Sequence, residues 1–247
     1  MTDVNDQLVL VCGESGSGKS ASLRNIRNQE KWYYVNTEAG KKLPMQNNFK
    51  FLKVIDPYQV YEAFDVGTTK ADCEGIIIDS LTFLMDMFET KYISKSSDTR
   101  KAWDDYNQFF KTMLQEKVVA FNKPVIFLAH LQDTYDEKNL EYKQAVPIKG
   151  SLRGRGVEAY FSTVVYSMTL PLAKVEDFKD NGLLHVNEDE EIEGVKYIFQ
   201  TRKTRDTTNT RIRSPIGLFS QKETYMDNDC QLLLDHLTKY YSKGKME

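Results

Sequence analysis

The sequence predicts an α/β fold in which helices cover both faces of a mostly parallel, twisted sheet. Apolar runs of strand length recur along the 247 residues, and segments with helical periodicity separate them. This alternation is typical of βαβ units, whose strands lie parallel. One run, Ile76-Ile77-Ile78, contains no polar residue, as expected of a strand that is buried on both faces. With 40% apolar residues, the chain can bury the core that such a sheet needs.

The apolar runs place the strands in order along the chain. They are expected at residues 8–12, 32–35, 49–55, 75–79, 125–130, 163–170 and 196–200. A glycine loop follows the first strand, and we expect a helix to begin after it, near Lys19, with Leu23 and Ile26 facing inward. The final helix is expected to begin around residues 227–229, where Asp and Asn side chains can cap it.

Three further segments have patterns of their own. Between residues 98 and 121, Trp103, Tyr106 and Phe110 repeat at helical spacing, so we expect a helix whose aromatic residues belong to the core. Residues 132–151 lack such a period, and their mixed charges indicate a long exposed loop. The acidic run at 188–191 is expected to be a solvated turn between strands.

Composition excludes several classes of protein. No run approaches the roughly 20 apolar residues that span a bilayer, and the polar residues 1–7 lack the layout of a signal peptide. We therefore expect a cytoplasmic protein that does not enter membranes. The three cysteines, Cys12, Cys73 and Cys230, are far apart and odd in number, so neither a disulfide framework nor a metal site built from cysteines is indicated.

The net charge of -3 does not give the molecule the basic field of an obligate nucleic-acid binder. Any contact with DNA must therefore come from local basic patches. One patch is a glycine-rich stretch with Lys149, Arg153 and Arg155. A second patch consists of Arg202, Lys203, Arg205, Arg211 and Arg213.

The glycine loop carries the most specific motif in the chain. It has the form Gly-x-x-x-x-Gly-Lys-Ser and stands between a buried strand and a predicted helix, which is the context of a P-loop. Its glycines let backbone N–H groups turn inward around an anion, and the start of the helix adds partial positive charge. The motif consists of Gly13, Glu14, Ser15, Gly16, Ser17, Gly18, Lys19 and Ser20. We expect ATP with Mg²⁺ here: the Lys19 ammonium reaches the β- and γ-phosphates, and the Ser20 hydroxyl ligates magnesium.

Further candidate residues stand where predicted strands end. Asp79 ends an apolar strand at the carboxyl edge of the sheet, where open α/β sheets bind ligands, and is expected to join the magnesium shell. Because the next residue is Ser80, the group that activates the attacking water must come from elsewhere. Glu38 can do so if its strand lies beside the P-loop strand; the alternative is a surface glutamate in a turn. His130 also ends an apolar strand, and we expect it to sense the γ-phosphate; the alternative is a core histidine.

The order of these motifs resembles the ATPase core of RecA- and DnaB-type proteins. That order is a P-loop, a glutamate after the second strand, Ile77-Ile78-Asp79-Ser80, a strand ending in His130, and a late Lys-x-Arg segment. The segments Val35-Asn36-Thr37-Glu38 and Arg211-Ile212-Arg213-Ser214-Pro215 more closely resemble small RecA-like ATPases that phages encode. That group includes single-strand annealing and recombination proteins. The similarity extends over residues 8–241.

The resemblance implies that the active site is completed between subunits of a homo-oligomer, either a ring or a filament. In such proteins a late strand carries Lys-x-Arg to the nucleotide of the neighbouring subunit, and the matching residues are Lys203 and Arg205. It also implies that Lys149, Arg153 and Arg155 belong to a DNA-binding loop. We expect a single RecA-like domain over 1–247, with a P-loop core at about 8–202 and a C-terminal hairpin and helix at about 203–242.

The leading hypothesis is an ATPase, stimulated by DNA, that acts on single-stranded DNA in phage recombination, annealing or replication. An alternative is an ATP-switched assembly module that binds protein partners without DNA, because the net charge is weakly acidic and no DNA-binding domain is appended. A small-molecule kinase is a third and less favoured hypothesis, since the sequence has no arginine-rich lid pattern and no acceptor-site motif.

Overall fold

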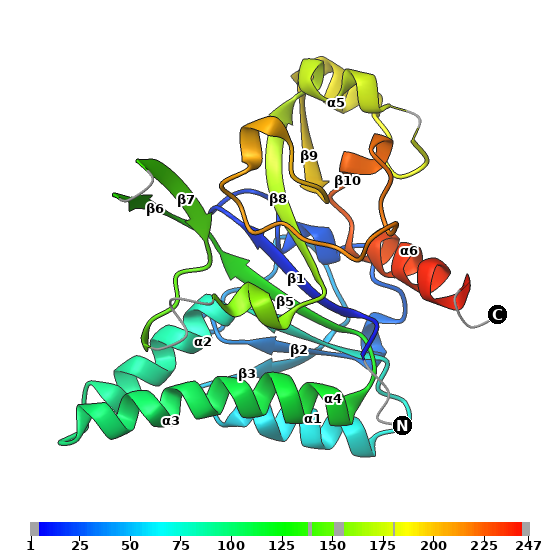
Figure 1. The fold of residues 1–247 in the computed structure, drawn as a ribbon. Helices are drawn as coiled ribbons and strands as arrows, with labels where there is room; N and C mark the ends of the chain where they lie inside the picture. Colours follow the sequence, from blue (N-terminus) through cyan, green and yellow to red (C-terminus); the bar gives the residue numbers. More distant parts are fainter. Residues whose placement is uncertain (1–4, 138–139, 151–155, 180, 244–247) are drawn as a thin grey trace.

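A central sheet organises the molecule in the computed structural model, which describes residues 5–137, 140–150, 156–179 and 181–243. Within these residues, an 8-stranded sheet has the order β10-β9-β8-β1-β5-β4-β2-β3 (Figure 1). Its strands are β1 (Leu8–Gly13), β2 (Trp32–Asn36), β3 (Lys50–Lys53), β4 (Gly75–Asp79), β5 (Val125–His130), β8 (Thr163–Pro171), β9 (Val195–Gln200) and β10 (Tyr225–Asp227). Neighbouring strands from β8 to β3 are parallel, whereas β9 and β10 are antiparallel. The structure thus confirms the predicted fold class, α/β with a mostly parallel sheet.

Helices cover both faces of this sheet. The face on which α1 to α4 lie is opposite the face that α6 covers (Figure 1). The α-helices of the described residues are α1 (Gln59–Thr69), α2 (Leu81–Phe88), α3 (Thr99–Thr112), α4 (Val118–Phe121), α5 (Glu188–Glu193) and α6 (Cys230–Lys243). The helix predicted at 98–121 forms as α3 and α4, which the π-helical segment Met113–Lys117 connects.

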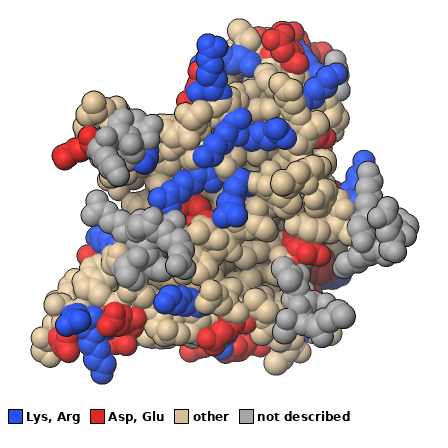
Figure 2. Space-filling view, in the orientation of Figure 1, with Lys and Arg blue, Asp and Glu red and all other residues tan. Residues whose placement is uncertain are grey.

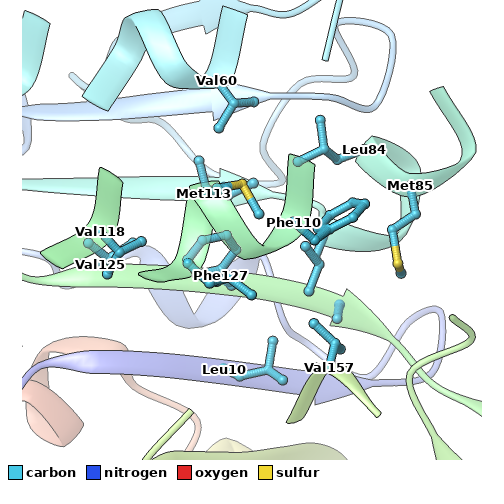
Figure 3. Close-up of a cluster of buried hydrophobic side chains, with 14 of the residues drawn as sticks. Leu10, Val60, Leu84, Met85, Phe110, Met113, Val118, Val125, Phe127 and Val157 are labelled. Carbon is cyan, nitrogen blue, oxygen red and sulfur yellow. The ribbon is translucent and has the colours of Figure 1, made fainter. Parts of the chain in front are cut away.

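Alternate residues of the buried strands enter two separate hydrophobic clusters. Leu10 of β1 and Phe127 of β5 belong to one cluster, where Phe110 and Met113 pack against them from the α3 side (Figure 3). The next residue of β1, Val11, belongs to the other cluster, which includes residues of α6. Because both faces of the sheet are buried, successive residues of its strands must be apolar. This explains the unbroken apolar runs in the sequence.

The prediction of a helix directly after the P-loop is wrong. The structure has only a 3-10 turn there, Ala21–Leu23. The Ser22 hydroxyl donates to the carbonyl oxygen of Lys19 and lies 3.1 Å from Cys230 Sγ. Such side-chain bonds to nearby backbone compete with regular helix, and Asn28 soon adopts a left-handed conformation (φ 51°). No helix dipole is therefore available to the P-loop from this segment.

Two other segments differ from their predicted structure. The expected loop at 132–151 contains an antiparallel hairpin of β6 (Gln132–Asp136) and β7 (Glu141–Ala145). The acidic run is the helix α5 instead of a turn. Its first residue follows Asn187, whose side chain accepts from the Glu190 N–H while the Glu190 side chain accepts from the Asn187 N–H. This capping box and the acidic first turn both stabilise a helix N-terminus.

The C-terminal part also requires a correction. Residues 203–224 form no hairpin of their own in the structure; β10 instead pairs antiparallel with β9. The final helix, α6, begins where it was predicted, and Asp229 Oδ1 accepts from the N–H groups of Gln231 and Leu232. Leu233 and Leu237 are buried as expected. Among the described residues, no helix has the length and apolar character needed to cross a membrane.

Candidate nucleotide site

The glycine loop follows β1 and adopts a conformation that its glycines permit. Gly16 (φ 80°) and Gly18 (φ 92°) have the positive φ values that side chains other than glycine disfavour. At Gly13 the constraint is different, because a Cβ atom would lie 2.6 Å from the backbone carbonyl oxygen of Ser167. Each of the three glycines of the motif is therefore required by the local geometry.

Residues from distant parts of the chain support this loop through a series of hydrogen bonds. The Ser167 hydroxyl, on β8, donates to the carbonyl oxygen of Ser17 at 2.7 Å. Asn228, at the start of the C-terminal helix, donates from Nδ2 to the Ser167 oxygen at 2.7 Å. Its own carbonyl oxygen accepts from Arg24 Nη1 at 2.9 Å. Ser167 and Asn228 are both 2% exposed, so this support is part of the protein interior.

The Lys19 side chain lies against the loop itself. Its Nζ donates to the carbonyl oxygens of Gly13 at 2.9 Å and Glu14 at 2.7 Å. Burial lowers the pKa of the ammonium, and the nearby carboxylate of Asp79 opposes this shift. A phosphate group in the loop would offer Lys19 a charged acceptor in place of two carbonyls, which makes a stronger hydrogen bond.

Ser20 and Asp79 are brought together as expected for a magnesium site. The Ser20 hydroxyl donates to Asp79 Oδ2 at 3.1 Å, and the Tyr34 hydroxyl donates to the same oxygen at 2.6 Å. The Asp79 side chain is almost fully buried, and this burial raises the pKa of its carboxyl group. One carboxylate and one hydroxyl suit Mg²⁺, which is usually held by few protein oxygens together with phosphates and water. These two residues would therefore hold the ion.

Glu38 and His130 also meet at this edge of the sheet. The distance from Glu38 Oε1 to His130 Nε2 is 3.2 Å, and Lys41 Nζ lies 3.4 Å from Glu38 Oε2. The hydrogen bond with His130 lowers the pKa of the Glu38 carboxyl group, although burial opposes it. Glu38 is thus ionised at neutral pH and able to accept a proton. Only 10% of its side chain is exposed, so it is not an open surface glutamate.

The condition stated for Glu38, that its strand lie beside the P-loop strand, is not met in the structure. Its strand, β2, does not lie beside the P-loop strand, because β4 and β5 stand between them. Glu38 reaches the site because the preceding residue is fixed to the end of β4: Thr37 N–H donates to the Asp79 carbonyl at 2.7 Å, and its hydroxyl to the Ser80 carbonyl at 2.7 Å. Thr82 Oγ1 accepts from the His130 N–H at 2.9 Å. The backbone at Thr37, next to Glu38, and the backbone of His130 are therefore both anchored to the end of β4 and the segment after it.

One cavity of about 600 Å³ unites these groups. It is lined by the P-loop, Asp79, Glu38 and His130, together with residues that the sequence did not indicate. Those additional lining residues include Arg24, Tyr34, Leu43, His185, Lys196, Tyr197, Asp227 and Asn228. His185, Lys196, Tyr197 and Asp227 come from β9, β10 and the segment before α5, and no local pattern reveals that these elements lie beside the P-loop.

Other predicted residues lie outside this cavity. Lys203 and Arg205 are exposed and do not line it; the Lys203 ammonium donates to the Thr208 carbonyl at 3.4 Å. Lys149 forms an ion pair with Glu89. Arg153 and Arg155 fall outside the described residues. The cavity of a single chain therefore contains the phosphate loop, the metal pair and the Glu38–His130 pair, but not the Lys-x-Arg segment.

The fold and this site define a P-loop ATPase: a mostly parallel α/β sheet with a phosphate-binding loop after one strand and a buried acid after another. The chain belongs to the AAA domain family, whose sequence profile matches residues 5–211. No curated protein matches the sequence. Among solved structures, the crystal structure of the RadB recombinase is similar at 17% identity and a TM-score of 0.42, over 68% of this chain and 76% of that one.

Proposed function

We propose that the protein is a magnesium-dependent ATPase that acts on single-stranded DNA in recombination, annealing or replication, of the kind that phages encode. The observation that carries the ATPase assignment is the single cavity in which the P-loop, the Ser20–Asp79 pair and the Glu38–His130 pair converge. These are the groups that phosphoryl transfer to water requires: a phosphate cradle, a metal site and a group that orients the nucleophile.

The residues divide this work between binding and chemistry. Lys19 and the loop backbone bind the β- and γ-phosphates, while Ser20 and Asp79 hold Mg²⁺, which neutralises charge on the phosphates. Glu38 accepts a hydrogen bond from the attacking water and takes its proton. When Glu38 is ionised it can only accept, so His130 donates from Nε2 and fixes the direction of the carboxylate. Through this hydrogen bond, His130 would respond to the γ-phosphate.

A surface beside the hairpin β6–β7 supports the assignment of DNA. Tyr135 and Tyr142 are 51% and 63% exposed, and their ring centroids lie 5.1 Å apart. Lys and Arg side chains gather between this hairpin and β9 (Figure 2). Exposed aromatic rings beside positive charge suit single-stranded nucleic acid, whose bases stack and whose phosphates attract cations.

Hydrogen bonds connect this surface to the later basic segment and to the P-loop. Asn209, within the segment that carries the later arginines, donates to the Tyr142 carbonyl at 2.8 Å. Gln144 of the hairpin donates to Glu14 Oε1 of the P-loop at 3.4 Å. Lys149 lies a short distance after the end of β7 at Ala145. DNA on the hairpin would therefore act on a segment that touches the nucleotide loop, which gives stimulation by DNA a physical route.

The proposal includes a homo-oligomer, either a ring or a filament. Lys203 and Arg205 are exposed outside the cavity of their own chain, so they would serve the nucleotide of a neighbouring subunit. An arginine supplied in this way stabilises the charge that develops on the phosphates. We also propose a cytoplasmic protein with a single RecA-like domain, whose P-loop core extends over about 8–202.

ATP turnover with and without single-stranded DNA tests this function. Strong stimulation is expected. Turnover that DNA leaves unchanged would favour an ATP-switched module that binds protein partners, a function compatible with the net charge of -3. Turnover that requires a small acceptor molecule would instead indicate a kinase.

A further inference from the structure

The cavity extends to both sides of the P-loop strand. In the sheet, β5, β4 and β2 lie on one side of β1, and β8, β9 and β10 lie on the other. The proposed chemical groups, Asp79, Glu38 and His130, all come from the first side. If the γ-phosphate lies there, as the proposed function requires, the phosphate chain leads away from it, and the nucleoside must lie on the side of β9 and β10.

Tyr197 of β9 stands on that second side, directly against the P-loop. A Cβ atom at Gly18 would lie 3.0 Å from its ring atom Cδ1. Tyr197 is 47% exposed, although the residues that follow it in β9, Ile198 to Gln200, are buried. Arg24 lines the cavity from the segment after the P-loop. An aromatic face is therefore open to the cavity next to the phosphate cradle.

The wall around Tyr197 is held in place by a cluster of paired charges. Asp227 Oδ1 accepts from Lys196 Nζ at 3.0 Å, and Oδ2 lies 2.8 Å from His185 Nδ1. Lys196, of which 5% of the side chain is exposed, also pairs with Glu190 at 2.8 Å. These pairs fix the segment before α5 against β9 and β10. A wall that is ordered in advance loses little entropy when a ligand binds.

We propose that Tyr197 is the platform on which the base of the nucleotide stacks, and that the nucleoside lies between it and the segment around His185. Every nucleobase has an aromatic face, so stacking binds bases without strong preference. Gly18 stands between this platform and the phosphate cradle, so one ligand reaches both. This inference rests on the proposed function, because it takes the bound ligand to be a nucleoside triphosphate.

Binding of ATP and of inorganic tripolyphosphate, each with Mg²⁺, tests the inference by calorimetry. Tripolyphosphate occupies the cradle but has no base. Tyr197→Leu keeps an apolar contact with Gly18 and removes the aromatic ring, so its affinity for ATP should fall about 5- to 150-fold while its affinity for tripolyphosphate stays unchanged. Tyr197→Phe should bind ATP like the wild type. Tyr92→Ala is the matched control: this tyrosine is 38% exposed, does not line the cavity, and should leave both affinities unchanged.

Two results would overturn the assignment of Tyr197 and leave the proposed function intact. If Tyr197→Leu binds ATP as tightly as the wild type does, the base lies elsewhere. If the affinities of Tyr197→Leu for ATP and for tripolyphosphate fall by the same factor, Tyr197 shapes the P-loop through Gly18 and does not contact the base. A wild-type protein that binds neither ligand would instead overturn the proposed function, and this inference with it.

Discussion

His130 Nε2 lies 3.2 Å from Glu38 Oε1, although 92 positions separate the two residues in the chain. They end β5 and follow β2, two strands that flank β4 on opposite sides. Asp79, at the end of β4, therefore lies between them at the carboxyl edge of the sheet. This arrangement places a proton acceptor, its hydrogen-bond donor and a metal ligand within one cavity, so each of these residues can be tested separately.

Glu38→Gln should separate binding from chemistry. The amide retains the shape of the side chain but cannot take a proton from water, so ATP hydrolysis should fall by about 100- to 10,000-fold while ATP binding persists. Lys19→Ala should instead weaken ATP binding. Single-turnover hydrolysis and equilibrium binding measure the two effects, and Glu30→Gln, at an exposed acid, is the control. Wild-type turnover in Glu38→Gln would exclude Glu38 as the base.

The pH profile of kcat/KM should depend on His130. Its hydrogen bond lowers the pKa of Glu38, and burial raises it, so removing the imidazole should raise this pKa. Because the carboxylate must be ionised to accept a proton, activity falls as pH falls through its pKa. The acidic limb of His130→Ala should therefore lie at higher pH than that of the wild type. The control is His236→Ala, because the imidazole of His236 binds the Leu218 carbonyl away from the cavity. In this variant the acidic limb should lie at the same pH as in the wild type. An equal shift in both variants would contradict the prediction.

Mixed oligomers should reveal an active site shared between subunits. Arg205→Ala should retain ATP binding but hydrolyse ATP poorly, because the arginine that stabilises transition-state charge is missing. Mixing it with Lys19→Ala subunits should restore part of the activity, since an intact P-loop then meets an intact Arg205 at some interfaces. Activity is measured across mixing ratios, with light scattering in saturating ATP. No recovery, together with a monomer under those conditions, would refute the shared site.

The basic residues and the tyrosines should affect DNA binding in different ways. Replacing Lys149, Arg153 and Arg155 with alanine should abolish stimulation by DNA and make binding less sensitive to salt, by a log-log slope of about 0.7 for each phosphate that the variant no longer neutralises. Turnover without DNA should stay close to that of the wild type. If the affinity for DNA and its dependence on salt are both unchanged in this variant, DNA binds another surface. Arg211 and the arginines near it are then the next candidates.

The double variant Tyr135→Ala, Tyr142→Ala should weaken binding of single-stranded DNA without changing its salt dependence. Stacking on an aromatic ring contributes about 1–3 kcal/mol per base and releases no counterions. Affinity should therefore fall at every salt concentration by a similar factor, as measured by fluorescence anisotropy. The corresponding phenylalanine variant should bind like the wild type. A changed slope, or unchanged affinity, would argue against stacking on the hairpin.

Local sequence patterns were sufficient to predict most strands of the sheet but not all the residues that line the cavity. The unbroken apolar run of β4 reflects burial on both faces, so it was visible in the sequence, and the glycine spacing of the P-loop reflects its own backbone. The segment after that loop, where the predicted helix is absent, contains Ser22, whose hydroxyl contacts Cys230, 208 positions away. Likewise, Tyr197 lies beside Gly18 only because of the order of the strands. Contacts between distant segments produce no periodic pattern in the sequence, so they could not be predicted from it.

The bonds that run from Asn228 through Ser167 to Ser17 have a consequence for how the protein is made. The P-loop precedes Ser167 and Asn228 in the chain, so two of the residues that support its backbone are synthesised after it, and Asn228 only shortly before α6. A nascent chain that ends before Asn228 thus has the complete motif without its support. Nucleotide binding should accordingly arise only after Asn228 has been synthesised, and a chain truncated after β9 should carry an intact motif that binds ATP weakly.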